Sequence, residues 1–424
     1  MSFEIRKIND PNANENCTVA VHSSGLKVYL NEKPHLNVNY AVFGTHYGSV
    51  DTEFSLGDAP KIQVPEGIAH FLEHKLFEGE DGDAFEKYAV TGASANAYTS
   101  FDRTCYLFSC SERFYENLDI LLSFVSSPYF TPETVQKEQG IIGQEIRMYE
   151  DVPDWRVLFN LLRGMYHNHP VNVEIAGTVE SIAEITDKTL YDCYNTFYNP
   201  SNMFVAISGN INSDKVLEII DQKIKPRDTA PINRSEFSEP DSIVKPYTEQ
   251  KMAVSMPLFA FGIKDNVAKI GCTLKQKLQT ELLLDTAVGK ISPLYSRLLN
   301  EGLINSRFGT EFFYGHGYSA LLFEGESKDP KQVTELIKAE LESIAQNGID
   351  PDLFEDARRN LYGRQIRSLD DPEGVVDDFL MAAICDYEPY DTLNVLREMT
   401  AEDITERAKE LDLENASLSV ILPL

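Results

Sequence analysis

The sequence lacks long hydrophobic runs and has few basic residues, and each shortage removes a class of function. No run of about 18 consecutive apolar residues occurs in the 424 residues, so no membrane-spanning helix is expected. The first residues, MSFEIRKINDPNANEN, lack the charged, apolar and small-residue regions of a secretory signal. The net charge of -29 disfavours nucleic acid and anionic membranes as partners. A cytoplasmic protein with no nucleic-acid and no membrane partner is predicted.

Cysteine is also scarce, and its distribution excludes two kinds of framework. The six cysteines form no C-x-x-C pair, so neither a disulfide scaffold nor a cysteine zinc site is indicated. Apolar residues at 42% and charged residues at 25% are typical of a soluble globular protein. Because 424 residues exceed one ordinary core, two or more domains are expected.

The order of predicted elements indicates two halves. Strand-like runs at 18–50 are followed by helical patterns to about residue 195 and by a further strand at 201–211. The next segment, 223–247, is polar and contains several prolines, so it is predicted to be a linker. The expected boundaries are an N-terminal half at 1–222 and a C-terminal half at 248–424.

The two halves resemble each other when they are aligned at a constant offset. GIAHFLEHKLF, from residue 67, aligns with GKISPLYSRLL, from residue 289, and each half closes on an apolar strand. This alignment predicts two similar halves. Only the first half keeps the titratable trio, because Ser292, Tyr295 and Ser296 occupy the positions of His70, Glu73 and His74.

His70, Glu73 and His74 fall on one face of a predicted helix whose other sides are apolar. Histidines at i and i+4 can present two imidazole nitrogens to one metal, and a glutamate at i+3 then lies beside the metal's water. The alternative is an ordinary buried helix that carries two histidines. The H-x-x-E-H pattern arises by chance about once in eighty chains of this composition, which favours a metal site.

A third protein ligand is expected from the segment TPETVQKEQGIIGQEIRMYEDVPDW. Thr131 and Pro132 suit the start of a helix there. Glu138 and Glu145 lie seven residues apart and therefore point the same way, whereas Glu150 lies about 140° round the helix from Glu145. Spacing alone does not choose the ligand among these glutamates.

The three motifs H-x-x-E-H, N-A-Y-T and E-x6-E together resemble the inverzincin metallopeptidases related to pitrilysin, insulin-degrading enzyme and mitochondrial processing peptidase. The resemblance extends over nearly the whole chain, and KLFEGEDGDAF is similar to a branch found in Gram-positive bacteria. It implies Zn²⁺ held by His70, His74 and Glu145. It also implies that Glu138 supports catalysis from just outside these ligands and that Glu73 is the general base.

The resemblance further implies a fold and a substrate class. We expect an α+β protein with two similar halves, each an antiparallel sheet with helices on one face, which together form half of a peptidase chamber. The expected activity is endopeptidase cleavage of short or unfolded peptides. The segment SANAYTS would be an edge strand that pairs with the substrate at Asn96 and Ala97. The alternative for this segment is an ordinary half-buried strand.

One feature of the family is missing. Members that act as a single polypeptide, or as identical dimers, carry an arginine and a tyrosine seven residues apart in the other half, but Leu298 and Asn305 occupy these positions here. Arg297, Tyr314 and Tyr318 are conceivable substitutes, although a one-residue shift turns a helical side chain by about 100°.

The missing pair predicts a partner. We expect a heterodimer with a homologous subunit that lacks zinc ligands and supplies arginine and tyrosine, or else a homodimer. Two alternatives to this zinc endopeptidase are a catalytically silent structural or peptide-binding subunit of the same family, and another zinc hydrolase such as an amidase.

Overall fold

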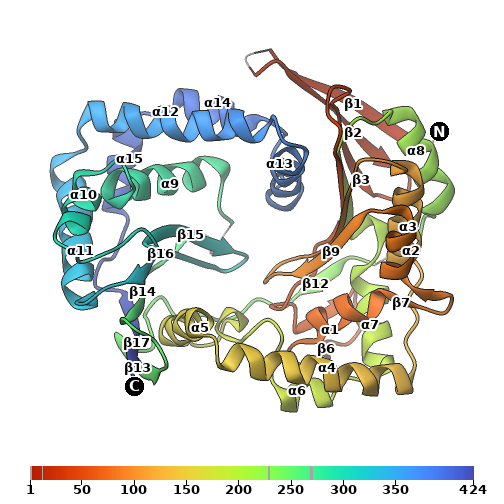
Figure 1. Cartoon of the computed structure of the whole chain (residues 1–424), viewed down its shortest axis with the longest axis horizontal. Coiled ribbons are helices and arrows are strands. Elements are labelled where there is room, and N and C mark those ends of the chain that lie inside the picture. Colours follow the sequence, from red (N-terminus) through yellow and green to blue (C-terminus); the bar gives the residue numbers. More distant parts are fainter. Residues whose placement is uncertain (1, 12, 228–229, 268–270) are drawn as a thin grey trace. The chain divides into compact units, whose positions relative to one another are not determined.

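The computed structural model describes residues 2–11, 13–227, 230–267 and 271–424 (Figure 1). These residues form two compact units, and each unit draws on separate stretches of the chain. Unit 1 comprises Met1–Ile146, Glu174–Ser235 and Ile366–Tyr390, and unit 2 comprises Arg147–Val173, Glu236–Gln365 and Asp391–Leu424. Within the described residues, no helix has both the length and the apolar character needed to cross a membrane.

Unit 1 is built on a seven-stranded sheet with the order β1-β2-β3-β11-β4-β10-β9. Neighbouring strands are antiparallel, except that β11 runs parallel to β3. The strands are β1 (Phe3–Asp10), β2 (Glu15–His22), β3 (Lys27–Glu32), β4 (Asn39–Thr45), β9 (Ser94–Thr99), β10 (Thr104–Cys110) and β11 (Met203–Gly209). The edge positions of this sheet therefore belong to β1 and β9.

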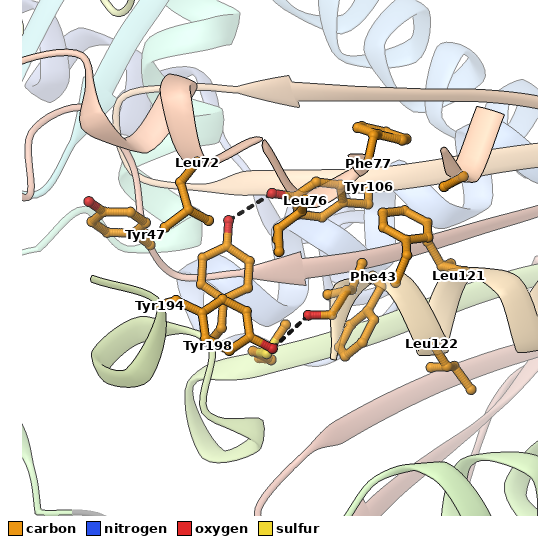
Figure 2. Close-up of a cluster of buried hydrophobic side chains, with 14 of the residues drawn as sticks. Phe43, Tyr47, Leu72, Leu76, Phe77, Tyr106, Leu121, Leu122, Tyr194 and Tyr198 are labelled. Carbon is orange, nitrogen blue, oxygen red and sulfur yellow. Dashed lines mark hydrogen bonds between the residues drawn. The ribbon is translucent and has the colours of Figure 1, made fainter. Parts of the chain in front are cut away.

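Helices cover one face of this sheet and enclose its hydrophobic core. They are α1 (Ile68–Leu76), α2 (Ala84–Thr91), α3 (Phe114–Val125), α7 (Asp187–Phe197) and α8 (Ser213–Lys223). Figure 2 shows Leu72 and Leu76 of α1 beside this core, where the hydroxyl groups of Tyr106 and Tyr198 lie 2.8 Å apart. Buried tyrosine hydroxyls need a hydrogen-bond partner, and these two provide it for each other inside the core on which α1 packs.

The second face of the unit 1 sheet is covered by α13 (Pro372–Cys385), which comes from the C-terminal half of the sequence. Its Phe379 stacks on Tyr29 of β3, with ring centroids 5.9 Å apart. The hydroxyl of Tyr40 on β4 donates to the Glu373 carboxylate at 3.4 Å. Side chains on both faces of the sheet are thus buried, which explains why all seven residues of β4 are buried.

Smaller elements complete unit 1. Strands β5 (Glu53–Leu56), β6 (Ile62–Gln63) and β12 (Ile232–Arg234) form a separate sheet, and β7 (Glu78–Gly79) pairs with β8 (Gly82–Asp83) in a short hairpin. The short helix α6 (Val179–Ala183) follows residue 178. The long helix α4 (Pro132–Glu150) begins in unit 1 and ends in unit 2.

Unit 2 has a five-stranded sheet with the order β13-β17-β14-β16-β15, in which only β13 and β17 are parallel among the described pairs. The strands are β13 (Tyr247–Met252), β14 (Leu258–Asp265), β15 (Gly309–Gly315), β16 (Tyr318–Glu326) and β17 (Ala416–Pro423). The helices that share its core are α9 (Leu274–Val288), α10 (Pro293–Asn300), α11 (Pro330–Asn347), α12 (Pro351–Ser368), α14 (Asp391–Glu398) and α15 (Ala401–Lys409). The other face receives α5 (Pro153–Met165), for which Gly262 leaves room: a Cβ there would lie 2.5 Å from the Met165 sulfur.

The predicted α+β fold with two similar halves is confirmed, and the structure adds two features. Each sheet contains one parallel pair, and each receives one helix from the other half of the sequence, α13 in unit 1 and α5 in unit 2. A single cut at 223–247 therefore separates the two sheets but not the two compact units. That segment contains β12, and its Glu239 forms a buried ion pair at 2.6 Å with Lys264 of β14.

Candidate metal centre

Helix α1, which carries His70, Glu73 and His74, begins after a glycine in a left-handed backbone conformation. Gly67 has φ 85°, and a Cβ at this residue would lie 2.3 Å from the Ala176 carbonyl oxygen. Only glycine adopts this backbone conformation without cost, so the helix can start directly against the 176–177 turn. Ile68, Phe71 and Leu72 are then buried in the core. His70, Glu73 and His74 occupy the remaining side of the helix.

Helix α4 supplies the acidic side of the centre. It begins at Pro132 as predicted, and the Thr131 hydroxyl accepts a hydrogen bond from the Thr134 backbone N–H at 3.3 Å. Glu138 is buried and Glu145 is half-buried, whereas Glu150 at the helix end is exposed. The structure therefore brings two of the three candidate glutamates to the histidines of α1.

His70, His74 and Glu145 converge so that one ligand atom from each lies within 4.8 Å of the other two. The Nε2 atom of His70 is 3.8 Å from one Glu145 carboxylate oxygen, and Nε2 of His74 is 3.6 Å from the other. In the described part of the chain, these three residues are the only such group of histidine, cysteine and acidic side chains. Two imidazoles and one carboxylate with a further open position fit a catalytic zinc ion.

Glu138 contacts His74 from behind. One Glu138 carboxylate oxygen lies 3.0 Å from Nδ1 of His74. A histidine that donates its Nδ1 proton to a carboxylate keeps Nε2 free as a lone-pair donor, an arrangement common around protein metal ions. Burial lowers the pKa of His74, but the hydrogen bond that its ring donates to Glu138 and the charges of Glu73 and Glu145 outweigh burial and leave the pKa raised.

His70 is held differently. Its Nδ1 atom is buried and has no hydrogen-bond partner among the described residues. Burial, with a smaller effect from His74, lowers its pKa to about 3, so its imidazole is neutral. Neutral imidazole is the form that binds metal, and only Nε2 of His70 lies near Glu145. Burial therefore keeps the His70 ring neutral, whereas a carboxylate partner orients the ring of His74.

Glu73 has the environment of a general base. It is 8% exposed, and its Oε2 atom accepts a hydrogen bond from the Thr99 hydroxyl at 2.6 Å. Burial is the largest effect on its pKa and raises it above the usual value, against the opposing hydrogen bond from Thr99. The sequence prediction did not include Thr99. It lies in the N-A-Y-T motif two residues after Ala97, so the alternation of a strand places both on one face.

The strand that bears Asn96 and Ala97 is an edge strand, as predicted. β9 pairs with β10 alone, and Ala97 lies opposite Tyr106. Asn96 is exposed, and its side-chain oxygen accepts the Ala97 backbone N–H at 2.9 Å. The structure thus places both residues on the outer strand of the unit 1 sheet.

A cavity of about 600 Å³ opens beside the centre within unit 1. Glu73, His74 and Glu138 line it on one side, and Asn96 and Ala97 line it from β9. The remaining walls come from the end of α1, the β7–β8 hairpin, the start of α2 and α4. Titratable side chains, an edge strand and a cavity thus meet at one place, which is the usual form of an active site.

The equivalent region of unit 2 has a structural role. Ser292 caps α10 by accepting the Tyr295 backbone N–H at 3.0 Å. Leu298 is 0% exposed and belongs to the hydrophobic core. The side-chain amide of Asn305 donates to Glu326 at 2.6 Å. Leu298 is apolar, and Asn305 has a neutral side chain whose amide donates to a carboxylate, so neither carries the positive charge of an arginine or the hydroxyl of a tyrosine.

The other close histidine pair, His167 and His169, has no metal-site geometry. His167 is exposed, whereas His169 is buried and its two ring nitrogens contact the protein backbone, at the His316 carbonyl and the Val171 N–H. Burial is the largest effect on the pKa of His169 and lowers it to about 4. His169 therefore has a structural role, since both ring nitrogens bond to backbone groups.

Comparisons with known proteins match both halves of the chain to one peptidase family. Residues 55–179 match the family model described as insulinase, peptidase family M16, and residues 184–361 match the model described as peptidase M16 inactive domain. The uncharacterised zinc protease YmfH of Bacillus subtilis is 42% identical over 388 residues, which are 90% of each chain. The uncharacterised zinc protease SCO5738 of Streptomyces coelicolor is 24% identical over 94% of this chain and 88% of its own.

Solved structures share the fold. An M16-like peptidase from Alicyclobacillus acidocaldarius superimposes with a TM-score of 0.91 at 35% identity, over 100% of this chain and 99% of its own. Pitrilysin superimposes with a TM-score of 0.75 at 17% identity, and this chain covers only 46% of it. The family predicted from the H-x-x-E-H, N-A-Y-T and E-x6-E motifs is confirmed. On the evidence of 42% identity to YmfH across 90% of both sequences, this chain belongs to peptidase family M16.

Proposed function

We propose that this protein is a zinc-dependent endopeptidase that cleaves short or unfolded peptides. The observation that supports this most is the convergence of His70, His74 and Glu145, whose ligand atoms lie within 4.8 Å of one another. Glu73 lies on the same helix, one residue from His74, in the position of a base. A silent structural subunit would have no need for three buried or half-buried titratable groups on one helix face.

The residues of α1 and α4 would hold the ion. His70 and His74 would bind through Nε2 and Glu145 through its carboxylate, while Glu138 orients His74 through Nδ1. When bound, zinc would supply Lewis-acid activation of the scissile carbonyl and of the attacking water.

Glu73 would move the proton. Thr99 holds its Oε2 atom, which leaves Oε1 to accept a proton from the attacking water. Water adds its oxygen to the peptide carbonyl carbon, and Glu73 then returns the proton to the leaving amine as the C–N bond breaks. The raised pKa of Glu73 suits both steps. A carboxylate with a raised pKa is a stronger base toward water, and the carboxylic acid it forms can still protonate the leaving amine.

The edge of β9 would bind the substrate. Backbone hydrogen bonds to Asn96 and Ala97 would hold an extended peptide whatever its sequence. A folded protein does not offer a free extended strand, so unfolded segments and short peptides would be preferred substrates.

Catalysis would need a second chain. Leu298 and Asn305 stand where related enzymes have arginine and tyrosine. Leu298 is buried and Asn305 is paired with Glu326. Pitrilysin is about twice as long as this chain, which covers 46% of it. A homologous subunit without zinc ligands would supply the two side chains, and a second copy of this chain is the alternative partner.

The direct test is cleavage of a pool of unstructured peptides by the zinc-loaded chain, read by mass spectrometry, alone and with a homologous M16 subunit. Cleavage is expected with the partner and should vanish in Glu73→Gln, which keeps its zinc. Zinc binding without cleavage in either mixture would favour the silent peptide-binding subunit. Cleavage that survives Glu73→Gln would contradict the assigned base.

A further inference from the structure

The cavity beside the metal centre has two chemically different walls. Its apolar wall contains Phe77 and Phe85, whose rings stack with centroids 4.2 Å apart, together with Ile141 of α4. Phe85 is 46% exposed and Ile141 is 47% exposed, so both present apolar surface to whatever enters. These three side chains give the cavity apolar surface beside its titratable groups.

The β7–β8 hairpin, which lies between Phe77 and Phe85 in the sequence, adds acidic side chains to the lining. Glu78, Glu80 and Asp83 line the cavity there, and Lys137 of α4 is the one basic residue among the lining side chains. This lysine is already engaged, since its Nζ lies 3.8 Å from a Glu78 carboxylate oxygen. Glu78 also accepts a hydrogen bond from the buried Lys75, and its pKa lies below the usual value mainly because of that bond.

Glu80 remains without a partner. It makes no hydrogen bond or ion pair with any described residue, while Asp83 accepts the Phe85 backbone N–H at 2.7 Å as the cap of α2 and can still accept at its other oxygen. An unpaired carboxylate and a stacked aromatic pair that line one cavity complement a long side chain with an apolar stem and a positive end. Phenyl rings also attract cations at their faces.

We propose that this cavity binds a lysine or arginine side chain of the peptide, at a residue next to the scissile bond. The methylene stem would lie against Phe77, Phe85 and Ile141, and the cation would reach Glu80 and Asp83. Glu73 and His74 line the same cavity, so a side chain held there places its own backbone at the metal centre. This inference rests on the proposed peptidase function and adds its substrate class.

The test uses amino-acid hydroxamates, which anchor on zinc and need neither turnover nor a partner chain. The probes are lysine hydroxamate and norleucine hydroxamate, which share a four-carbon stem and differ in the terminal ammonium. Their dissociation constants are measured by titration calorimetry on the zinc-loaded full chain. Lysine hydroxamate should bind about 5-fold more tightly, as expected for one partly exposed ion pair.

Charge reversal locates the effect. In Glu80→Lys the preference for lysine hydroxamate should disappear or reverse, while the affinity for norleucine hydroxamate stays unchanged and shows that the cavity is intact. Glu86→Lys is the matched control, because Glu86 is exposed on α2 but does not line the cavity. Equal binding of both probes to the wild type, or an unchanged preference in Glu80→Lys, would overturn this inference alone. Failure of both hydroxamates to bind would overturn the metal centre itself.

Discussion

Glu138 and His74 are joined by a 3.0 Å contact between a carboxylate oxygen and Nδ1, across helices α4 and α1. This contact fixes which nitrogen of His74 carries the proton and turns Nε2 toward Glu145. Glu138 lies 64 residues after His74 in the sequence, so this contact links the H-x-x-E-H helix to a distant part of the chain.

Removing the charge of Glu138 should weaken zinc binding. Glu138→Gln keeps the shape of the side chain but loses the carboxylate that orients His74, and partners of metal-binding histidines typically contribute about 10- to 100-fold in affinity. The zinc dissociation constant, measured by competition with a chromogenic chelator, should rise by that factor. Glu150→Gln, an exposed position on the same helix, should leave it unchanged. Equal effects of the two substitutions would contradict the role assigned to Glu138.

Thr99 should affect catalysis without affecting zinc. Thr99→Val is nearly isosteric and removes the 2.6 Å hydrogen bond to Glu73, so the base loses its fixed orientation. We expect kcat to fall roughly 10-fold, with the zinc content and the unfolding midpoint little changed. The control is Ser94→Ala, at an exposed position of the same strand. Loss of zinc in Thr99→Val would show that the threonine supports the fold of the site instead.

Gly67 and Gly140 provide a matched pair for the start of α1. Gly67→Ala forces a side chain into a positive φ and toward the Ala176 carbonyl, and should cost about 3 kcal/mol of unfolding free energy. Gly140→Ala, in the middle of α4 with no heavy atom within 4 Å of the new Cβ, should add about 1 kcal/mol. Urea denaturation measures both. Equal stability of the two variants would mean that the 67–77 helix does not begin as described.

Glu324 should make unit 2 less stable as the pH rises. Burial, and to a lesser extent Glu311 and Asp154, raise its pKa to about 7 from 4.5. A carboxyl whose pKa is raised by folding binds a proton on folding, so its contribution is fully present below pH ~4.5 and is lost as the pH passes through ~7. Glu324→Gln should therefore be more stable than the wild type by about 2 kcal/mol at pH 9 and nearly equal to it at pH 5.

Urea unfolding at pH 5, 7 and 9 checks this sign. Glu335→Gln, at an exposed position of α11, controls for the general effect of removing one negative charge from an acidic protein. A difference between Glu324→Gln and the wild type that does not grow from pH 5 to pH 9 would show that Glu324 is not buried as described.

The sequence predicts the site residues best where several of them lie on one helix. His70, Glu73 and His74 share one helix, so their common face followed from the 3.6-residue period alone. The same reasoning could not choose between Glu138 and Glu145, because both point the same way and only the approach of α4 to α1 distinguishes them. The resemblance implied Glu145 as the ligand, and the structure places Glu145 near both histidines and Glu138 behind one of them.

Features that depend on long-range packing were not predictable from local pattern. The hydrogen bond between Thr99 and Glu73 joins a strand and a helix 26 residues apart. The sequence of α13 does not show that it packs on the sheet of the other half. The hydrophobic pattern of a helix indicates that one face is buried, but not which sheet covers it. Segment 223–247 was predicted as a linker from its polarity, but polarity does not reveal that Glu239 pairs with a buried lysine.

The most direct test of the metal centre is anomalous X-ray diffraction at the zinc edge, from crystals of the protein loaded with one equivalent of zinc. We expect one strong peak about 2.0 to 2.2 Å from Nε2 of His70, Nε2 of His74 and a Glu145 carboxylate oxygen. We also expect the peak to be lost in the double variant His70→Ala, His74→Ala. A peak held by other residues, or no peak at this site in zinc-loaded crystals, would contradict this metal centre.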